Sequence, residues 1–142
     1  MDLEKGNVRV LQIFLVESQF RRENKLTYGD KDPVVAEIDL KPTLDVENKR
    51  IGTELQIKAS ISINNVKEVE ASIRMVGIFE YNDLPDEMLE EFPKVNAPAI
   101  IFPFVREHLM STSLKAGIKP IILAPINFVQ LSKRRDEGKE KE

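Results

Sequence analysis

In the middle of the chain, apolar and polar residues alternate strictly, a pattern typical of β-strands that bury one face. Within Gly52 to Ile63, every second side chain from Leu55 onward is apolar, and the alternation resumes from Val69 to Phe79. Asn64 and Asn65 lie between the two stretches, and asparagine tolerates the positive φ angles of a tight turn. The pattern therefore predicts an antiparallel hairpin.

Two further strands are expected before this hairpin. Residues 8–20 are apolar on both faces, with Val8, Val10, Phe14 and Val16 expected on one face and Leu11, Ile13 and Leu15 on the other. The second apolar face indicates a partner chain or a ligand surface, or else a central strand enclosed by its own domain. Residues 21–33 are polar and long for a hairpin, which favours a crossover loop. Residues 34–46 alternate again, and Pro42 suggests an edge strand or a bend.

The second half favours helices. Residues 82–92 place apolar side chains at four-residue intervals, with Asp83 as the expected cap of a short helix. Asn96 and the proline at 98 are expected to open a long helix that reaches Lys115, with Pro103 inside it as a source of a kink. The glycine at 117 and the proline at 120 would end this helix.

The end of the chain predicts an extended segment and a last helix. Residues 121–126 are apolar and bracketed by prolines, so they are expected to lie extended over a surface, and Asn127 is expected to cap the helix that follows. The residues beyond Lys133 are charged and expected to fray. The expected fold is a single α+β domain over residues 1–142. It has a four-stranded antiparallel sheet followed by a long helix and a short C-terminal helix, and a disordered tail begins at about residue 133.

Composition limits the possible chemistry. The 142 residues include no cysteine and one histidine, which excludes disulfides, thiol catalysis and cysteine metal sites. His108 and Glu107 are adjacent, so their side chains would diverge on a helix, and a packed histidine is the favoured interpretation. The sequence contains no phosphate-binding loop and no nucleophile or metal motif. These observations favour a binding protein, not an enzyme, without cofactor or metal.

Charge and hydropathy indicate the compartment. The net charge of −3 gives no electrostatic footprint for nucleic acid. The N-terminus shows no secretory signal, and no apolar run is long enough to cross a bilayer. A cytoplasmic protein is therefore expected.

The chain carries more apolar surface than one core requires. The excess lies in residues 8–20, 95–104 and 120–128. Self-assembly and the binding of unfolded client chains are both compatible with it, because one patch can serve each purpose. Many weak apolar contacts along a groove can hold an unfolded chain without demanding a sequence.

Several short sequence motifs in the second half of the chain resemble those of the SecB chaperone family. These motifs are GIF from Gly77 to Phe79, PAIIFPFVRE from Pro98 to Glu107 with a glycine turn after it, and LAPINF from Leu123 to Phe128. The resemblance runs from about Val10 to Leu131.

This resemblance implies an ATP-independent holdase that keeps precursor proteins unfolded for export. The implied assembly is a homotetramer, a dimer of dimers, with interfaces made by the sheets and the long helix. Clients would bind in hydrophobic grooves formed partly by the sheet, the crossover loop and the segment before the last helix. The candidate client-binding residues are Leu26, Tyr28, Val35, Leu44, Phe79, Tyr81, Ile122 and Phe128.

The family also implies docking to the translocation motor SecA through an acidic sheet surface. The matching positions are Glu17, Arg21, Glu70 and Ser72, and Arg21 carries the charge opposite to the expected one. Some SecB-like proteins serve an antitoxin of a toxin–antitoxin system, which is one alternative function. A structural oligomer without chaperone activity is the other.

Overall fold

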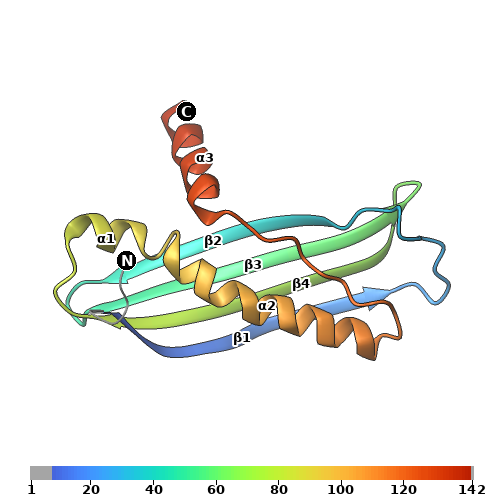
Figure 1. Cartoon of the computed structure of the whole chain (residues 1–142), viewed down its shortest axis with the longest axis horizontal. Helices are drawn as coiled ribbons and strands as arrows, with labels where there is room; N and C mark the ends of the chain where they lie inside the picture. The colour runs from blue at the N-terminus through green and yellow to red at the C-terminus, as the bar shows by residue number, and fades with distance from the viewer. Residues whose placement is uncertain (1–7, 142) are drawn as a thin grey trace.

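In the part of the chain that the structure describes, a four-stranded antiparallel sheet is combined with three helices (Figure 1). The computed structural model describes residues 8–141, with side chains described as far as residue 135. The elements are β1 (Val8–Arg22), β2 (Val35–Asp45), β3 (Arg50–Ile63), β4 (Val66–Tyr81), α1 (Asp86–Glu91), α2 (Asn96–Lys115) and α3 (Phe128–Lys141). The fold class predicted from the sequence is confirmed.

The order of strands across the sheet is β1-β4-β3-β2, so β1 and β2 are the two edge strands. Residues 23–34 connect these edges at one end of the sheet. Helix α2 crosses one face of the sheet diagonally, and the extended segment after α2 returns over the same face toward β2 and α3 (Figure 1). We call this the helix face, and the opposite face the outer face.

The core lies between α2 and the two central strands. Leu55 and Ile57 of β3 and Ile73 of β4 are buried against Ile101 and Leu109 of α2. These strands alternate as the sequence predicts, because only their helix face is covered. The hairpin is also confirmed, since Asn64 and Asn65 have φ angles of 51° and 67°.

The predicted faces of β1 are wrong, because two bulges interrupt its register with β4. Register shifts occur between Val10 and Gln12 and between Leu15 and Glu17. Each bulge resets the alternation. As a result, Ile13 and Leu15 lie on the helix face with Val10, and Phe14 is paired with Val76 on the outer face.

Several helix ends differ from the prediction. Helix α1 begins after Pro85, not at Asp83, which adopts a positive φ of 53°. Asn96 makes no capping bond, and its buried Oδ1 has no partner among the described residues. Helix α2 continues through Pro103 to Lys115. The expected cap at Asn127 is confirmed, because its Oδ1 accepts a bond of 3.0 Å from the amide of Gln130.

Helix α3 spans Phe128–Lys141. The disordered tail expected from about residue 133 stays a prediction. Among the described residues, no helix is long and apolar enough to cross a membrane.

Gly77 determines how closely α2 approaches the sheet. A Cβ atom at this position would lie 2.8 Å from Cδ1 and 2.9 Å from Cγ1 of Ile101, and 2.9 Å from Cε2 of Phe79. Such distances are shorter than van der Waals contact. The glycine therefore lets Ile101 pack directly on the backbone of β4.

Candidate functional site

Accessible apolar side chains form two groups, one on the edge strand β1 and one drawn from the crossover loop, β2 and the segment after α2. The first, which we call the β1 surface, is formed by large apolar side chains that remain exposed in the single chain. They are Val10, Leu11, Phe14, Leu15 and Val16. Val10 and Leu15 lie on the helix face of β1 and Phe14 on the outer face, so the edge strand exposes apolar side chains on both of its faces. Exposed apolar side chains gathered on one edge strand indicate an interaction site.

The second surface combines the crossover loop, the edge of β2 and the segment after α2. We call this group of side chains the β2 surface. Its members are Leu26 and Tyr28 of the loop, Leu44 near the other end of β2, where it is paired with Ile51, and Ile122. Leu26 and Tyr28 are half-buried and pack against the main core, which leaves part of each side chain accessible. Leu44 and Ile122 are 43% and 56% exposed. Each of these four candidate client-binding residues is thus accessible on the helix side or at the β2 edge.

The buried carboxylate of Glu68 holds the crossover loop in place. It accepts bonds from the amides of Thr27 at 2.7 Å and Tyr28 at 3.1 Å, and a third from the hydroxyl of Thr27. These bonds, led by that of the Thr27 hydroxyl, lower the pKa of Glu68 below its ordinary value of 4.5. Leu26 and Tyr28 are therefore presented by a loop with a defined backbone.

Glu68 can reach the loop because β4 bulges where it meets β3. Ile61 is paired with Val69 and Ser62 with Lys67, so Glu68 has no opposite residue on β3. A bulge redirects a side chain from its regular position. Sequence reasoning missed Glu68, since in the stretch VKEVE it resembles any solvated strand residue.

The crossover loop is also joined to the segment that carries Ile122. Arg22 donates to the carbonyl oxygen of Ala116 at 2.9 Å, and Lys119 lies 3.2 Å from the carboxylate of Asp30. The sequence therefore brings two separate segments to one side of the molecule.

Ser113, which is fully buried, fixes the start of this segment. Its hydroxyl donates to the carbonyl oxygen of Leu109 at 2.7 Å and accepts the amide of Ile121 at 3.3 Å. The chain after α2 is thereby held on the helix face.

Three of the candidate client-binding residues belong to the core. Phe79 is 0% exposed and packs edge-to-face on Phe92 at a centroid distance of 5.2 Å. Tyr81 is buried in the same cluster, and Phe128 is buried against Phe102. These three side chains support the fold and do not line an accessible surface of the single chain.

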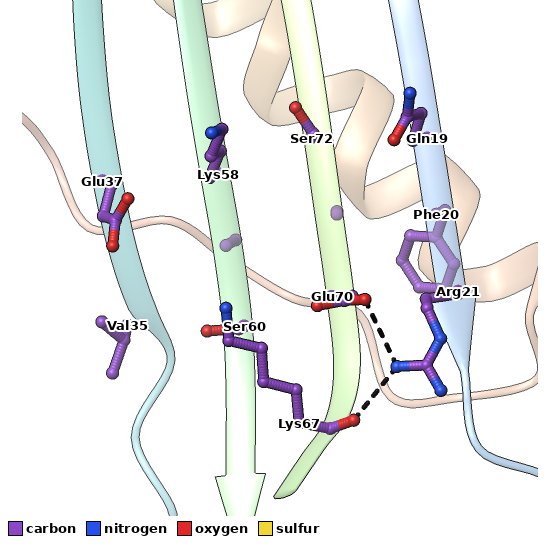
Figure 2. A pocket seen from close by; sticks show the side chains of 12 residues that line it. Gln19, Phe20, Arg21, Val35, Glu37, Lys58, Ser60, Lys67, Glu70 and Ser72 are labelled. Carbon is purple, nitrogen blue, oxygen red and sulfur yellow. Dashed lines mark hydrogen bonds and ion pairs between the residues drawn. The ribbon is translucent and has the colours of Figure 1, made fainter. Parts of the chain in front are cut away.

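The remaining candidate, Val35, is exposed on the outer face, away from the others. It lines a shallow hollow of about 410 Å³ near the end of the sheet, together with Arg21, Glu70 and Ser72 of the docking candidates. Figure 2 shows this hollow with the helix behind the sheet. Arg21, Glu70 and Ser72 thus lie on one surface, and their role in docking stays a prediction.

Ion pairs neutralise much of the charge on this surface. Arg21 lies 2.8 Å from Glu23 and 3.4 Å from Glu70, and its pKa is raised, chiefly by the hydrogen bond to Glu23. Glu17 is 3.5 Å from Arg74, which also pairs with Glu54 at 3.0 Å. The outer face is consequently of mixed charge and not a continuous acidic surface.

The single histidine is used to join α2 to β1. Nε2 of His108 lies 2.8 Å from the hydroxyl oxygen of Ser18. Within residues 8–135, no group of three or more His, Cys, Asp or Glu residues is arranged to hold a metal ion.

Comparison with known families identifies the relationship. The family model described as preprotein translocase subunit SecB matches residues 7–139. The chain belongs to the SecB family. SecB proteins are chaperones and not an enzyme class, which agrees with the expected absence of catalytic activity.

Several SecB proteins align with most of the chain. The protein-export protein SecB of Azoarcus sp. (strain BH72) is 24% identical over 138 residues, which cover 90% of this chain and 91% of that protein. SecB of Bartonella bacilliformis is 27% identical over 147 residues, covering 99% and 91%. SecB of Aromatoleum aromaticum is 30% identical over 105 residues, covering 62% and 66%.

A solved structure shares the SecB fold. It is the SecB-like chaperone of Mycobacterium tuberculosis in complex with a ChAD peptide from the HigA1 antitoxin. The superposition has a TM-score of 0.66 at 14% identity, and covers 88% of this chain and 94% of that one. At this identity the match concerns the fold.

Proposed function

We propose that this protein is an ATP-independent holdase that keeps unfolded precursor proteins competent for export. The observation that carries the proposal is the presence of two separate groups of accessible apolar side chains, one on the edge strand β1 and one around β2, the crossover loop and the segment after α2. The β1 surface is available for self-assembly, while the β2 surface remains for clients. A chain with a single apolar surface could not use one surface for self-assembly and keep another for clients.

The β2 surface suits a client without a fixed sequence. Its accessible members are aliphatic side chains and one tyrosine, contributed by separate segments. Each fully buried side chain of this kind contributes about 1.5–3 kcal/mol. Several such contacts along an extended chain give useful affinity, although ordering the client removes part of the gain.

The holdase is tested by light scattering of an unfolded, slowly refolding protein without ATP. The chain is expected to suppress aggregation. In the variant Leu26→Ser/Ile122→Ser, client affinity is expected to fall at least roughly tenfold, because apolar contact is lost from two segments. The control is Val66→Ser, which removes a side chain about as accessible as Ile122, 55% against 56% exposed, at the β3–β4 turn. Equal suppression by both variants would contradict the assignment of the β2 surface.

Self-assembly is proposed to use the β1 surface and α2. The expected assembly is a homotetramer in the cytoplasm. Leu15→Arg places a charge in the β1 surface and is expected to reduce the assembly size measured by multi-angle light scattering. An unchanged tetramer in this variant would remove the β1 surface from the interface.

Docking to SecA depends on the outer face. There Arg21 stands between Glu23 and Glu70, so we expect weaker binding to SecA than for a SecB with a carboxylate at this position. Arg21→Asp is therefore expected to strengthen binding to purified SecA, measured by calorimetry.

The charge of Arg21 also favours a second candidate function, a chaperone dedicated to an antitoxin. Complete absence of SecA binding in both forms, together with binding of one antitoxin, would support it. Aggregation of every client tested would instead indicate a structural oligomer.

A further inference from the structure

The free edge of β2 carries a side chain from the far end of the sequence. Arg135 of α3 donates to the carbonyl oxygens of Ile38 at 3.1 Å and Leu40 at 3.4 Å, and lies 3.5 Å from the carboxylate of Asp39. Helix α3 leaves the body of the molecule next to β2 (Figure 1). A guanidinium thus occupies acceptors that a neighbouring strand would use.

The geometry of an antiparallel ladder extends this observation along β2. Within such a strand, the N–H and C=O groups of one residue point to the same side, and this side changes with each residue. Since the carbonyl groups of Ile38 and Leu40 point outward, their amides do too, as do the backbone groups of Ala36. Within residues 8–135, Arg135 is the one group bonded to these outward groups.

Two features delimit the available edge. Pro42 follows in the same outward series and has no N–H group, so regular pairing ends there. Between residues 35 and 45, the register of β2 with β3 is uninterrupted, whereas that of β1 with β4 contains two shifts. The regular edge at residues 36–40 has about the length of a short strand.

We propose that the edge of β2 at residues 36–40 binds an extended segment of an unfolded polypeptide by strand addition, with Arg135 as the group it displaces. Main-chain bonds to Ala36, Ile38 and Leu40 require no particular client sequence, because every peptide unit except that of proline supplies them. The incoming strand would lie beside the apolar side chains of β2, of which Leu44 is exposed and Ile38 is half-buried. This inference rests on the proposed holdase function and assigns part of the client contact to the backbone.

Arg135 gives the edge a second state. While α3 is docked, the guanidinium satisfies two outward carbonyl groups and screens the edge from other chains. A client must replace these charge-assisted bonds with its own amides. The affinity of the edge for a strand is therefore reduced by the contact it breaks.

The first test uses a synthetic peptide of about six alternating valine and threonine residues. Amide hydrogen exchange, followed by NMR in the assembled protein, reports on Ile38 and Leu40, whose exchange is expected to slow when the peptide binds. The amides of Glu37 and Asp39 point toward β3 and serve as internal controls. Binding without protection of Ile38 and Leu40 would overturn the proposal.

N-methylation separates backbone pairing from side-chain contact. Methyl groups on one alternating set of peptide amides remove the donors that face β2, whereas the other set points to solvent. A strand can reverse its direction and present its other edge, so a peptide methylated on one set keeps one competent edge, whereas a peptide methylated on every amide has none. The fully methylated peptide is therefore expected to lose binding, and its unchanged binding would refute strand addition.

The role of Arg135 is tested by substitution. Arg135→Ala is expected to bind the peptide roughly two- to ten-fold more tightly, because the bonds to Ile38 and Leu40 need not be broken. Arg134→Ala is the matched control, which removes the same charge from the exposed neighbour. Equal affinity of the two variants would remove Arg135 from the mechanism.

Aggregation suppression measured on the same samples distinguishes the two proposals. If suppression persists while Ile38 and Leu40 stay unprotected, strand addition fails and the holdase stands. If there is neither suppression nor peptide binding, both fail.

Discussion

Gly77→Ala tests whether the position of α2 on the sheet depends on the missing side chain. The new Cβ would meet Ile101 at 2.8 and 2.9 Å and Phe79 at 2.9 Å, and both neighbours are fully buried. Neither can move into solvent, so the helix or the strand must shift. Overpacking of this kind costs about 1–3 kcal/mol.

The expected change in melting temperature follows from the chain length. For a domain of this size, 1 kcal/mol corresponds to about 4 °C in Tm. Gly77→Ala is therefore expected to lower the Tm by about 4–12 °C, measured by calorimetry at constant protomer concentration. Gly29→Ala is the control, because a Cβ there meets nothing within 4 Å.

A double-mutant cycle identifies the contact itself. Ile101→Val removes Cδ1, the atom nearest to the new Cβ, at a cost of about 0.5–1.5 kcal/mol on its own. In the presence of Gly77→Ala, this truncation relieves strain, so the double variant should be more stable than the sum predicts by at least about 0.5 kcal/mol. Strict additivity, or a Tm within about 1 °C of the parent for Gly77→Ala, would refute the reasoning.

Three further predictions concern the loops and the turn. Glu68→Gln is expected to speed amide exchange in the crossover loop at neutral pH. In the parent, the stabilising contribution of Glu68 is complete above pH 4.5 and is lost as the pH falls through its lowered pKa, an acid sensitivity that the variant should lack. Ser113→Ala leaves the buried amide of Ile121 without its partner and should lower the free energy of unfolding by about 1–3 kcal/mol, with Ser111→Ala as the control in urea denaturation. Asn65→Val is expected to cost about 1–2 kcal/mol at its positive φ, and Asn65→Gly close to nothing.

The central hairpin could be predicted because one local rule governs it. In β3 and β4, one covered face produces the alternation, and Asn64 and Asn65 mark the turn. The edge strand β1 could not be predicted equally well. Its bulges at Leu11 and Val16 depend on pairing with β4, which the spacing of residues 8–20 does not encode.

The sequence predicted which segments contribute to the candidate site better than it predicted which of their side chains are accessible. The crossover loop and the segment after α2 do lie on one side of the molecule. A phenylalanine can be buried in a core or exposed at a binding surface, so the residue type of Phe79 and Phe128 does not decide between the two. Only the packing in the structure shows that both are buried. Likewise, Glu68 and Arg135 acquire their roles from backbone groups distant in sequence, which leave no local signal.

The two bulges of β1 also bear on how the protein avoids polymerising. An uninterrupted edge strand with apolar side chains can recruit copy after copy into an open-ended fibril. In β1, Leu11 and Val16 break the ladder into short regular stretches, so pairing between copies cannot propagate along the whole strand. The interrupted edge therefore limits open-ended growth between copies, although the chain exposes apolar side chains along β1.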